Sequence, residues 1–116
     1  MIGQAVKRLF TTEEYHRMAP HGVLTEDERV ELLAGEVMQM SPIGSRHAAC
    51  VNRLARLLFT KVGGRAIVSV QNPIHLSGHS EPQPDLALLQ PREDFYVDAH
   101  PEPEDVMMKW RKPRRM

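Results

Sequence analysis

The clearest periodic pattern lies between residues 46 and 62, where apolar side chains recur every three or four positions. This spacing places them on one face of an amphipathic helix. Ser45 is the expected N-cap, and Gly63-Gly64 is expected to end the helix. The apolar face consists of Ala48, Val51, Leu54, Ala55, Leu58 and Val62. We therefore expect a long helix that packs on a sheet through this face.

A shorter helix is expected near the N-terminus. Thr11 is followed three residues later by Glu14, which is the spacing of a capping box. The helix should run to about Met18, because Pro20 and Gly22 follow it.

Short apolar runs between turn residues predict strands. Ala34-Gly35 is the expected turn of a hairpin, and Asn72-Pro73 interrupts a later strand. The strand after Met108 is expected to break off where basic residues begin. The predicted strands are residues 29–33, 36–40, 66–70 with 74–76, 86–89 and 106–108. This order predicts an α/β (α+β) fold with a mixed sheet flanked by helices. The expected core residues are Leu54, Leu58, Ile67, Val68, Leu86 and Leu88.

A chain of 116 residues is long enough for one small domain with a modest core. No apolar run approaches the ~20 residues of a membrane helix, so no membrane partner is expected. The N-terminus lacks the apolar core of a secretory signal. The single cysteine, Cys50, cannot form an internal disulfide. We expect a cytoplasmic protein.

The charge of the chain is unevenly distributed. Fifteen basic residues balance fifteen acidic ones, but five of the basic residues lie within residues 109–116, which hold no acid. The remainder of the chain is therefore net acidic by five charges. A nucleic-acid-binding surface is usually basic, and the body of this chain is not evidently so. We divide the chain into a domain at residues 1–108 and a basic tail at 109–116.

The most informative candidate for chemistry is Asp85. Pro82 and Pro84 hold the approach to it extended, and the apolar residues 86–89 then predict a buried strand. A carboxylate at the start of a stiff strand suits a hard cation such as Mg²⁺, which prefers oxygen ligands. The alternative is an ordinary turn acid, since Pro-Asp is common in loops.

Other candidates stay open between a functional and a structural role. Glu31 and Glu36 flank the predicted turn as possible accessory acids, or as charges on a solvated hairpin. His47 at the start of the long helix could contact a phosphate or a carboxylate, or could serve only local packing. His75 and His79 lie in or near a turn, and a zinc site would need more Cys or His at tight spacing.

Several local sequences together resemble the Uma-two family of restriction endonucleases, within the PD-(D/E)xK nuclease superfamily. The resemblance covers roughly residues 10 to 108 and rests on residues 29–37, Met40-Ser41-Pro42, His47 and Pro84-Asp85-Leu86-Ala87. It implies a restriction-endonuclease-like fold, DNA as the partner and Mg²⁺ as the cofactor. It also implies that Asp85 is a catalytic metal ligand. We expect Glu36, in preference to Glu31, to be the second catalytic and metal-binding acid.

The chain departs from the family pattern after residue 108. In the family the next strand carries an acidic-x-Lys motif, whereas this chain has Lys109-Trp110-Arg111-Lys112 there. We therefore expect an impaired endonuclease in which this part of the fold is incomplete at the C-terminus. The basic tail could be a nucleic-acid arm with Trp110 stacking on a base, or the product of a shifted reading frame or an early end.

The alternative function is a non-catalytic interaction or nucleic-acid-binding domain of nuclease fold. An open sheet edge after Leu89 would provide its contact surface, because an exposed edge can pair with another strand. A homodimer is the expected product of such pairing.

Overall fold

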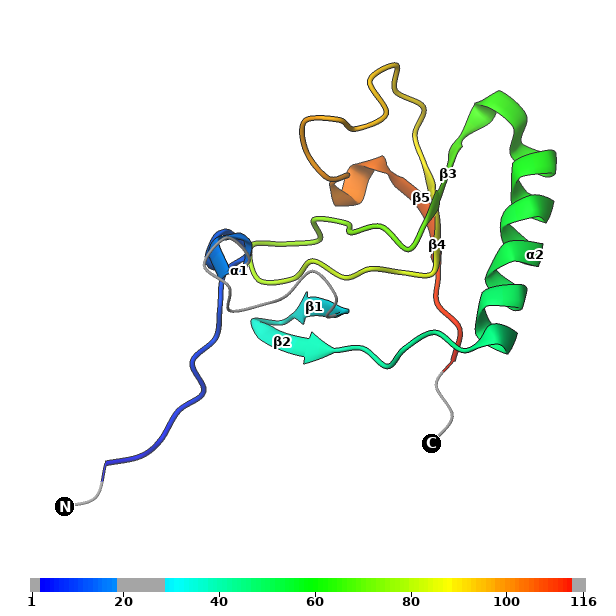
Figure 1. Cartoon of the computed structure of the whole chain (residues 1–116). Helices are drawn as coiled ribbons and strands as arrows, with labels where there is room; N and C mark the ends of the chain where they lie inside the picture. Colours follow the sequence, from blue (N-terminus) through cyan, green and yellow to red (C-terminus); the bar gives the residue numbers. More distant parts are fainter. Residues whose placement is uncertain (1–2, 19–28, 114–116) are drawn as a thin grey trace.

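The computed structural model describes residues 3–18 and 29–113. In chain order the elements are α1 (Thr12–Met18), β1 (Val30–Leu33), β2 (Glu36–Gln39), α2 (Ser45–Val62), η2 (Gly63–Arg65), β3 (Ile67–Val70), β4 (Leu86–Leu89), η3 (Pro103–Asp105) and β5 (Val106–Trp110). Figure 1 shows α2 and the strands β3 to β5 on one side of the molecule, with α1 and the β1–β2 hairpin on the other. The α+β class predicted from the sequence is confirmed.

The strands form two antiparallel sheets, β1-β2 and β3-β4-β5. The expected mixed sheet is therefore wrong in one respect, because the described residues contain no parallel pair. A parallel pair needs a crossover connection. Here the segments between β3 and β4 and between β4 and β5 reverse the direction of the chain, so both pairs are antiparallel.

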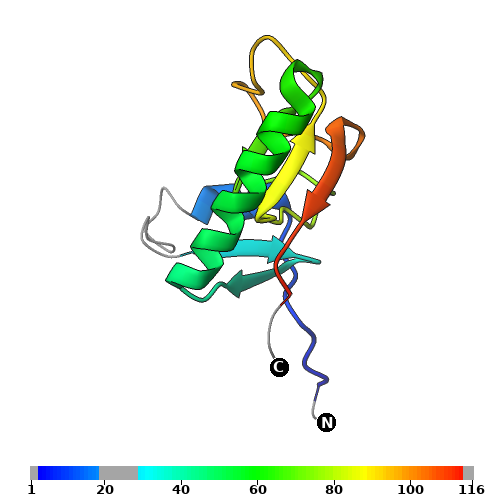
Figure 2. The ribbon, with the colours of Figure 1, turned by 90° about the vertical axis from the view of Figure 1, so that its right-hand side faces the viewer.

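The long helix α2 lies against the three-stranded sheet and runs alongside β4, as Figure 2 shows. Gly63 ends it with a φ of 53°, as predicted, and donates its N–H to the carbonyl of Phe59. The N-cap is Gly44 and not Ser45, and no side chain caps the helix start. Val51 is buried, whereas Leu54 and Leu58 are only half-buried.

The core lies mainly around β4, the central strand of its sheet. Leu86 is completely buried, but the other five residues of the expected core are half-buried. A second cluster joins Ala87 and Leu89 to Ile74, which lies on the extended segment before β4. Residues 74–76 were expected to continue the strand 66–70, but they belong to no strand, because Asn72-Pro73 interrupts the chain before them.

The turn between β1 and β2 lies against the segment that leads to β4. Ala34 and Gly35 have φ values of 50° and 83°, the pair of positive angles that a two-residue hairpin turn of type I′ requires. Gly35 donates its N–H to the carbonyl of His79 at 2.7 Å and accepts a hydrogen bond from Phe10 at 2.8 Å. The N–H of Glu81 reaches the carbonyl of Leu32 at 2.7 Å. Backbone contacts thus fix the hairpin against the segment that leads to β4.

Two expectations about the C-terminal strand are wrong. β5 does not break off after Met108, because Lys109 and Trp110 pair with Ala87 and Leu86. A strand at the edge of a sheet tolerates such residues, since its side chains face water. Because β5 pairs with β4, the strand β4 is not an open edge. In the described residues the edges of the sheet are β3 and β5.

The predicted capping box at the start of α1 is confirmed. The N–H of Glu14 donates to the hydroxyl of Thr11 at 3.1 Å, and the N–H of Thr11 donates to the Glu14 carboxylate at 3.0 Å. Within the described part of the chain, neither α1 nor α2 is long and apolar enough to cross a lipid bilayer.

Candidate functional site

Asp85 lies immediately before β4, and its side chain is almost completely buried. Its backbone carbonyl accepts a hydrogen bond from the N–H of Gln71 at 3.0 Å. Its Oδ2 atom accepts one from the backbone N–H of Lys112 at 2.8 Å. Asp85 is therefore held from two sides: Gln71, which follows β3, binds its backbone, and Lys112, which follows β5, binds its carboxylate.

His47 contacts the same carboxylate from the first turn of α2. Its Nε2 atom lies 3.0 Å from Oδ1 of Asp85. The two atoms are close enough for an ion pair, but their orientation does not meet the geometry of a hydrogen bond. The buried Nε2 makes no hydrogen bond within residues 3–18 and 29–113. Of the two roles considered for His47, the structure thus shows contact with a carboxylate.

Glu31 on β1 is the second buried acid, with an exposed fraction of 0%. The guanidinium of Arg111 binds it through two hydrogen bonds of 2.7 and 2.6 Å. The backbone N–H of Gln83 donates to the same carboxylate at 2.9 Å. The hydrogen bond with Glu31 raises the pKa of Arg111, and the charge of Asp85 adds to this effect.

Glu36 lies elsewhere, and this corrects the expectation that it faces one cleft with Asp85. Its carboxylate pairs with Lys7 at 2.6 Å and is 43% exposed. Register explains the difference, because Glu36 pairs with Leu33 at the turn whereas Glu31 lies two residues nearer the open end of the hairpin. The acid that the structure brings to Asp85, through Arg111 and Lys112, is therefore Glu31.

A pocket of about 370 Å³ opens over these groups. Its wall contains three cationic side chains and one carboxylate, Asp85, together with His47. The full lining is Arg29, Met40, Ser41, Pro42, His47, Asp85, Arg111, Lys112 and Pro113. Arg111 already binds Glu31, so Arg29 and Lys112 are the cations of this wall that can attract an oxygen-rich anion such as phosphate.

The arrangement does not fit a divalent cation as it stands. Both oxygens of Glu31 accept hydrogen bonds from Arg111, and Oδ2 of Asp85 accepts one from Lys112. Oδ1 of Asp85 is in contact with His47. No group of three or more His, Cys, Asp or Glu suited to a metal occurs in the described residues. Magnesium needs several oxygen ligands in near-octahedral geometry, so the guanidinium stands where a cation would have to enter.

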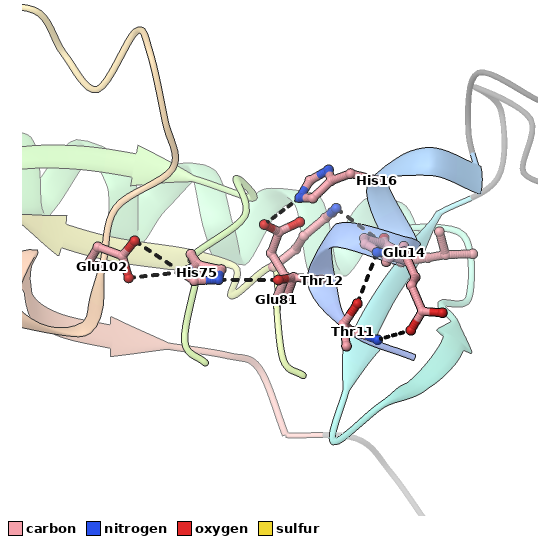
Figure 3. A network of polar contacts seen from close by, with 10 residues as sticks. Thr11, Thr12, Glu14, His16, His75, Glu81 and Glu102 are labelled. Carbon is pink, nitrogen blue, oxygen red and sulfur yellow. Dashed lines mark hydrogen bonds and ion pairs between the residues drawn. The ribbon is translucent and has the colours of Figure 1, made fainter. Parts of the chain in front are cut away.

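A second polar cluster lies on the other side of the molecule, between α1 and the segments near β4 and η3 (Figure 3). His16 contacts the buried Glu81 at 2.9 Å. His75 contacts Glu102 at 2.9 Å and approaches the hydroxyl of Thr12 at 3.4 Å. These contacts tie α1 to the loop before β5 and account for His75 as a structural residue. His79 contributes its backbone carbonyl to the hairpin turn.

The residues that sequence reasoning missed at the pocket are Arg111 and Lys112. They were assigned to a tail outside the domain, although they follow the last paired residue of β5 directly. Extending the predicted strand past Met108 would have indicated this position, because an antiparallel partner of residues 86–89 that continues in this way brings Arg111 and Lys112 beside Asp85. Arg114 and Arg115 lie outside the described residues.

Comparison with known proteins agrees with this architecture. No curated protein matches the chain. The family model named Uma2, described as "Putative restriction endonuclease", matches residues 12–108. This span holds Asp85, Glu31 and His47 and ends within β5. The chain therefore belongs to the Uma2 family of restriction-endonuclease-like proteins.

Proposed function

We propose that this chain is a DNA-binding member of a nuclease family whose own phosphodiester hydrolysis is weak or absent. The observation that carries the proposal is the pocket itself, whose lining brings the basic residues Arg29 and Lys112 together with the buried Asp85. Cations that neutralise phosphates supply most of the affinity of proteins for DNA.

Binding is attributed to Arg29 and Lys112, which line the pocket. Arg29 donates a hydrogen bond to the carbonyl of Ser41 at 3.2 Å, which orients its guanidinium along the pocket wall. Lys112 uses its backbone N–H for Asp85. Its ammonium group supplies a point charge for phosphate.

Weak hydrolysis follows from the groups that surround Asp85. In the family the strand after the Pro-Asp strand carries the second acid and a lysine, whereas none of the five residues of β5 is acidic. A Mg²⁺ ion at Asp85 and Glu31 would first have to displace Arg111. A metal that does not bind cannot lower the pKa of the attacking water.

Fluorescence anisotropy with a labelled DNA duplex tests the binding. Affinity should fall steeply as salt rises from about 50 to 200 mM. Replacing Arg29 or Lys112 with Ala should weaken binding and lower the slope of log affinity against log salt by about one. Lys61→Ala is the matched control, because Lys61 lies exposed in the last turn of α2. Equal binding by all variants would contradict the proposal.

A plasmid-cleavage assay tests the second part of the proposal, the weak or absent hydrolysis. With Mg²⁺ or Mn²⁺ the wild-type chain should cut little or not at all. Robust metal-dependent cutting that disappears in Asp85→Ala would overturn the proposed weakness of hydrolysis. It would also show that the pocket acquires its metal despite Arg111.

A second candidate function is a non-catalytic interaction domain, which the exposed edge of β5 favours. Met107 and Met108 on this strand are 51% and 40% exposed. An edge strand with apolar side chains can pair with a second chain. Sedimentation equilibrium would distinguish the two: a dimer that Met108→Lys dissociates, without DNA binding, would support this candidate.

A further inference from the structure

We propose that Arg111 is the built-in cation of the carboxylate site and keeps divalent cations out of it. This inference rests on the proposed function in one respect, since it takes the pocket at Asp85 as the functional site. It goes beyond that function because it names Arg111 as the residue that excludes divalent cations. It also predicts which cation the site would take if that residue were removed.

The first support is the match between the two charged groups. A planar guanidinium presents two parallel N–H donors, and a carboxylate accepts them in the same plane. Arg111 and Glu31 meet in this way at 2.7 and 2.6 Å, with Glu31 wholly buried. A buried carboxylate needs a compensating positive charge, and here the protein chain supplies it.

The second support is the position of the neighbouring residue. Lys112 donates its backbone N–H to Asp85, so two consecutive residues contact the two acids of this site, Glu31 and Asp85. They follow Trp110, the last residue of β5, which pairs with Leu86 next to Asp85. Displacement of this short segment would remove both contacts together, without loss of the pairing between β5 and β4.

Isothermal titration of the purified full chain with MnCl₂ tests the inference, with Mn²⁺ as a probe for hard divalent cations. The wild type should show no saturable binding below about 1 mM, the range of weak oxygen sites. Arg111→Ser should bind one Mn²⁺ at least about tenfold more tightly, and the double variant Arg111→Ser, Asp85→Asn should lose this gain. Arg17→Ser is the matched control, because Arg17 pairs with Glu13 on the exposed face of α1.

Two results would overturn the inference. One is tight Mn²⁺ binding by the wild type that Asp85→Asn abolishes. The other is an Arg111→Ser variant that folds and binds no more Mn²⁺ than the Arg17→Ser control. Neither result depends on DNA, so the inference can fail while the anisotropy results at Arg29 and Lys112 stand.

If Arg111→Ser does not fold, the inference can still be tested. Circular dichroism should then show that Mn²⁺ restores the fold, because the ion replaces the missing charge. An unfolded variant that Mn²⁺ does not refold counts against the inference. The double variant Arg111→Ser, Glu31→Gln removes the buried charge, so it should fold without metal and bind no Mn²⁺. Binding equal to that of Arg111→Ser would also overturn the inference.

Discussion

Glu31 and Arg111 lie eighty positions apart in the sequence, yet their side chains are joined by two hydrogen bonds of 2.7 and 2.6 Å. The Glu31 side chain is wholly buried, whereas the Arg111 side chain is 31% exposed. The pair is thus asymmetric: Arg111 can turn toward water, and Glu31 cannot. This asymmetry determines what substitution of each partner should do.

Arg111→Ala should destabilise the protein more than Glu31→Gln does. Removing Arg111 leaves a buried charge without its partner, and such losses cost about 3–5 kcal/mol, with the lower end expected for a partly exposed arginine. Glu31→Gln leaves a neutral amide, for which about 1–3 kcal/mol is expected. Urea unfolding measures both. Arg17→Ala, on the surface of α1, should stay within about 0.5 kcal/mol, and a similar value for Arg111→Ala would contradict the prediction.

Gly35→Ala should destabilise the contact between the β1–β2 turn and the segment that leads to β4. A Cβ atom at this position would lie 2.7 Å from Cβ of Leu9, and the φ of 83° is unfavourable for any L side chain. Backbone strain alone accounts for about 1–3 kcal/mol. Gly78→Ala is the control, because a Cβ there meets no atom within 4 Å. Thermal unfolding should show a clear loss for Gly35→Ala only, and equal melting temperatures would refute the role given to this turn.

Leu86→Ala should cost about 2–5 kcal/mol, the range for a leucine buried in a core. Leu86 is completely buried on the central strand. Leu57→Ala on α2 should cost less than about 0.5 kcal/mol, since Leu57 is 50% exposed. Chemical denaturation of both variants provides the comparison. A large effect at Leu57 would mean that this face of α2 is covered in solution.

Acid should weaken the start of α1. The hydrogen bond from Arg8, followed by that from the backbone of Thr11, lowers the pKa of Glu14 from 4.5 to about 2. A carboxyl group with a lowered pKa in the folded state contributes stability above its unfolded value and loses it as pH falls through the folded value. The contribution of Glu14 should therefore be complete above pH 4.5 and disappear toward pH 2.

Glu14→Gln provides the measurement for this prediction. The amide can still accept the hydrogen bond of the capping box but carries no charge. The stability difference between wild type and Glu14→Gln should be largest near neutral pH and shrink as pH falls below 4.5. A difference that does not change with pH would show that the charge of Glu14 contributes nothing.

Local patterns in the sequence predicted the helices closely. The spacing of apolar residues gave α2 to within one residue of its observed start at Ser45, and the capping box located the start of α1. Such features depend on contacts within a few residues of the chain, which a sequence displays directly. Asp85 was found for a similar reason, because its two prolines and the following strand are consecutive.

The partner of Asp85 could not be predicted in the same way. Glu31 and Glu36 stand at the two sides of a predicted turn, and Glu36 was the preferred candidate. Which of them approaches β4 depends on how the hairpin docks, through Gly35 with His79 and Leu32 with Glu81. Arg111 was missed because an edge strand is held by backbone pairing, so its basic side chains gave no sign that the strand continued.

The docking of the hairpin against the segment before β4 also has a consequence for the order of folding. Each sheet is built from strands that are successive in the sequence, and such pairs close shorter loops than contacts between the sheets and should form earlier. The contact of Leu32 with Glu81 spans a much longer stretch of chain, whose closure carries a larger entropic cost. We therefore expect the two sheets to form first and to join later. The buried acids would then come together only in the last step of folding, when an intermediate with intact sheets acquires its pocket.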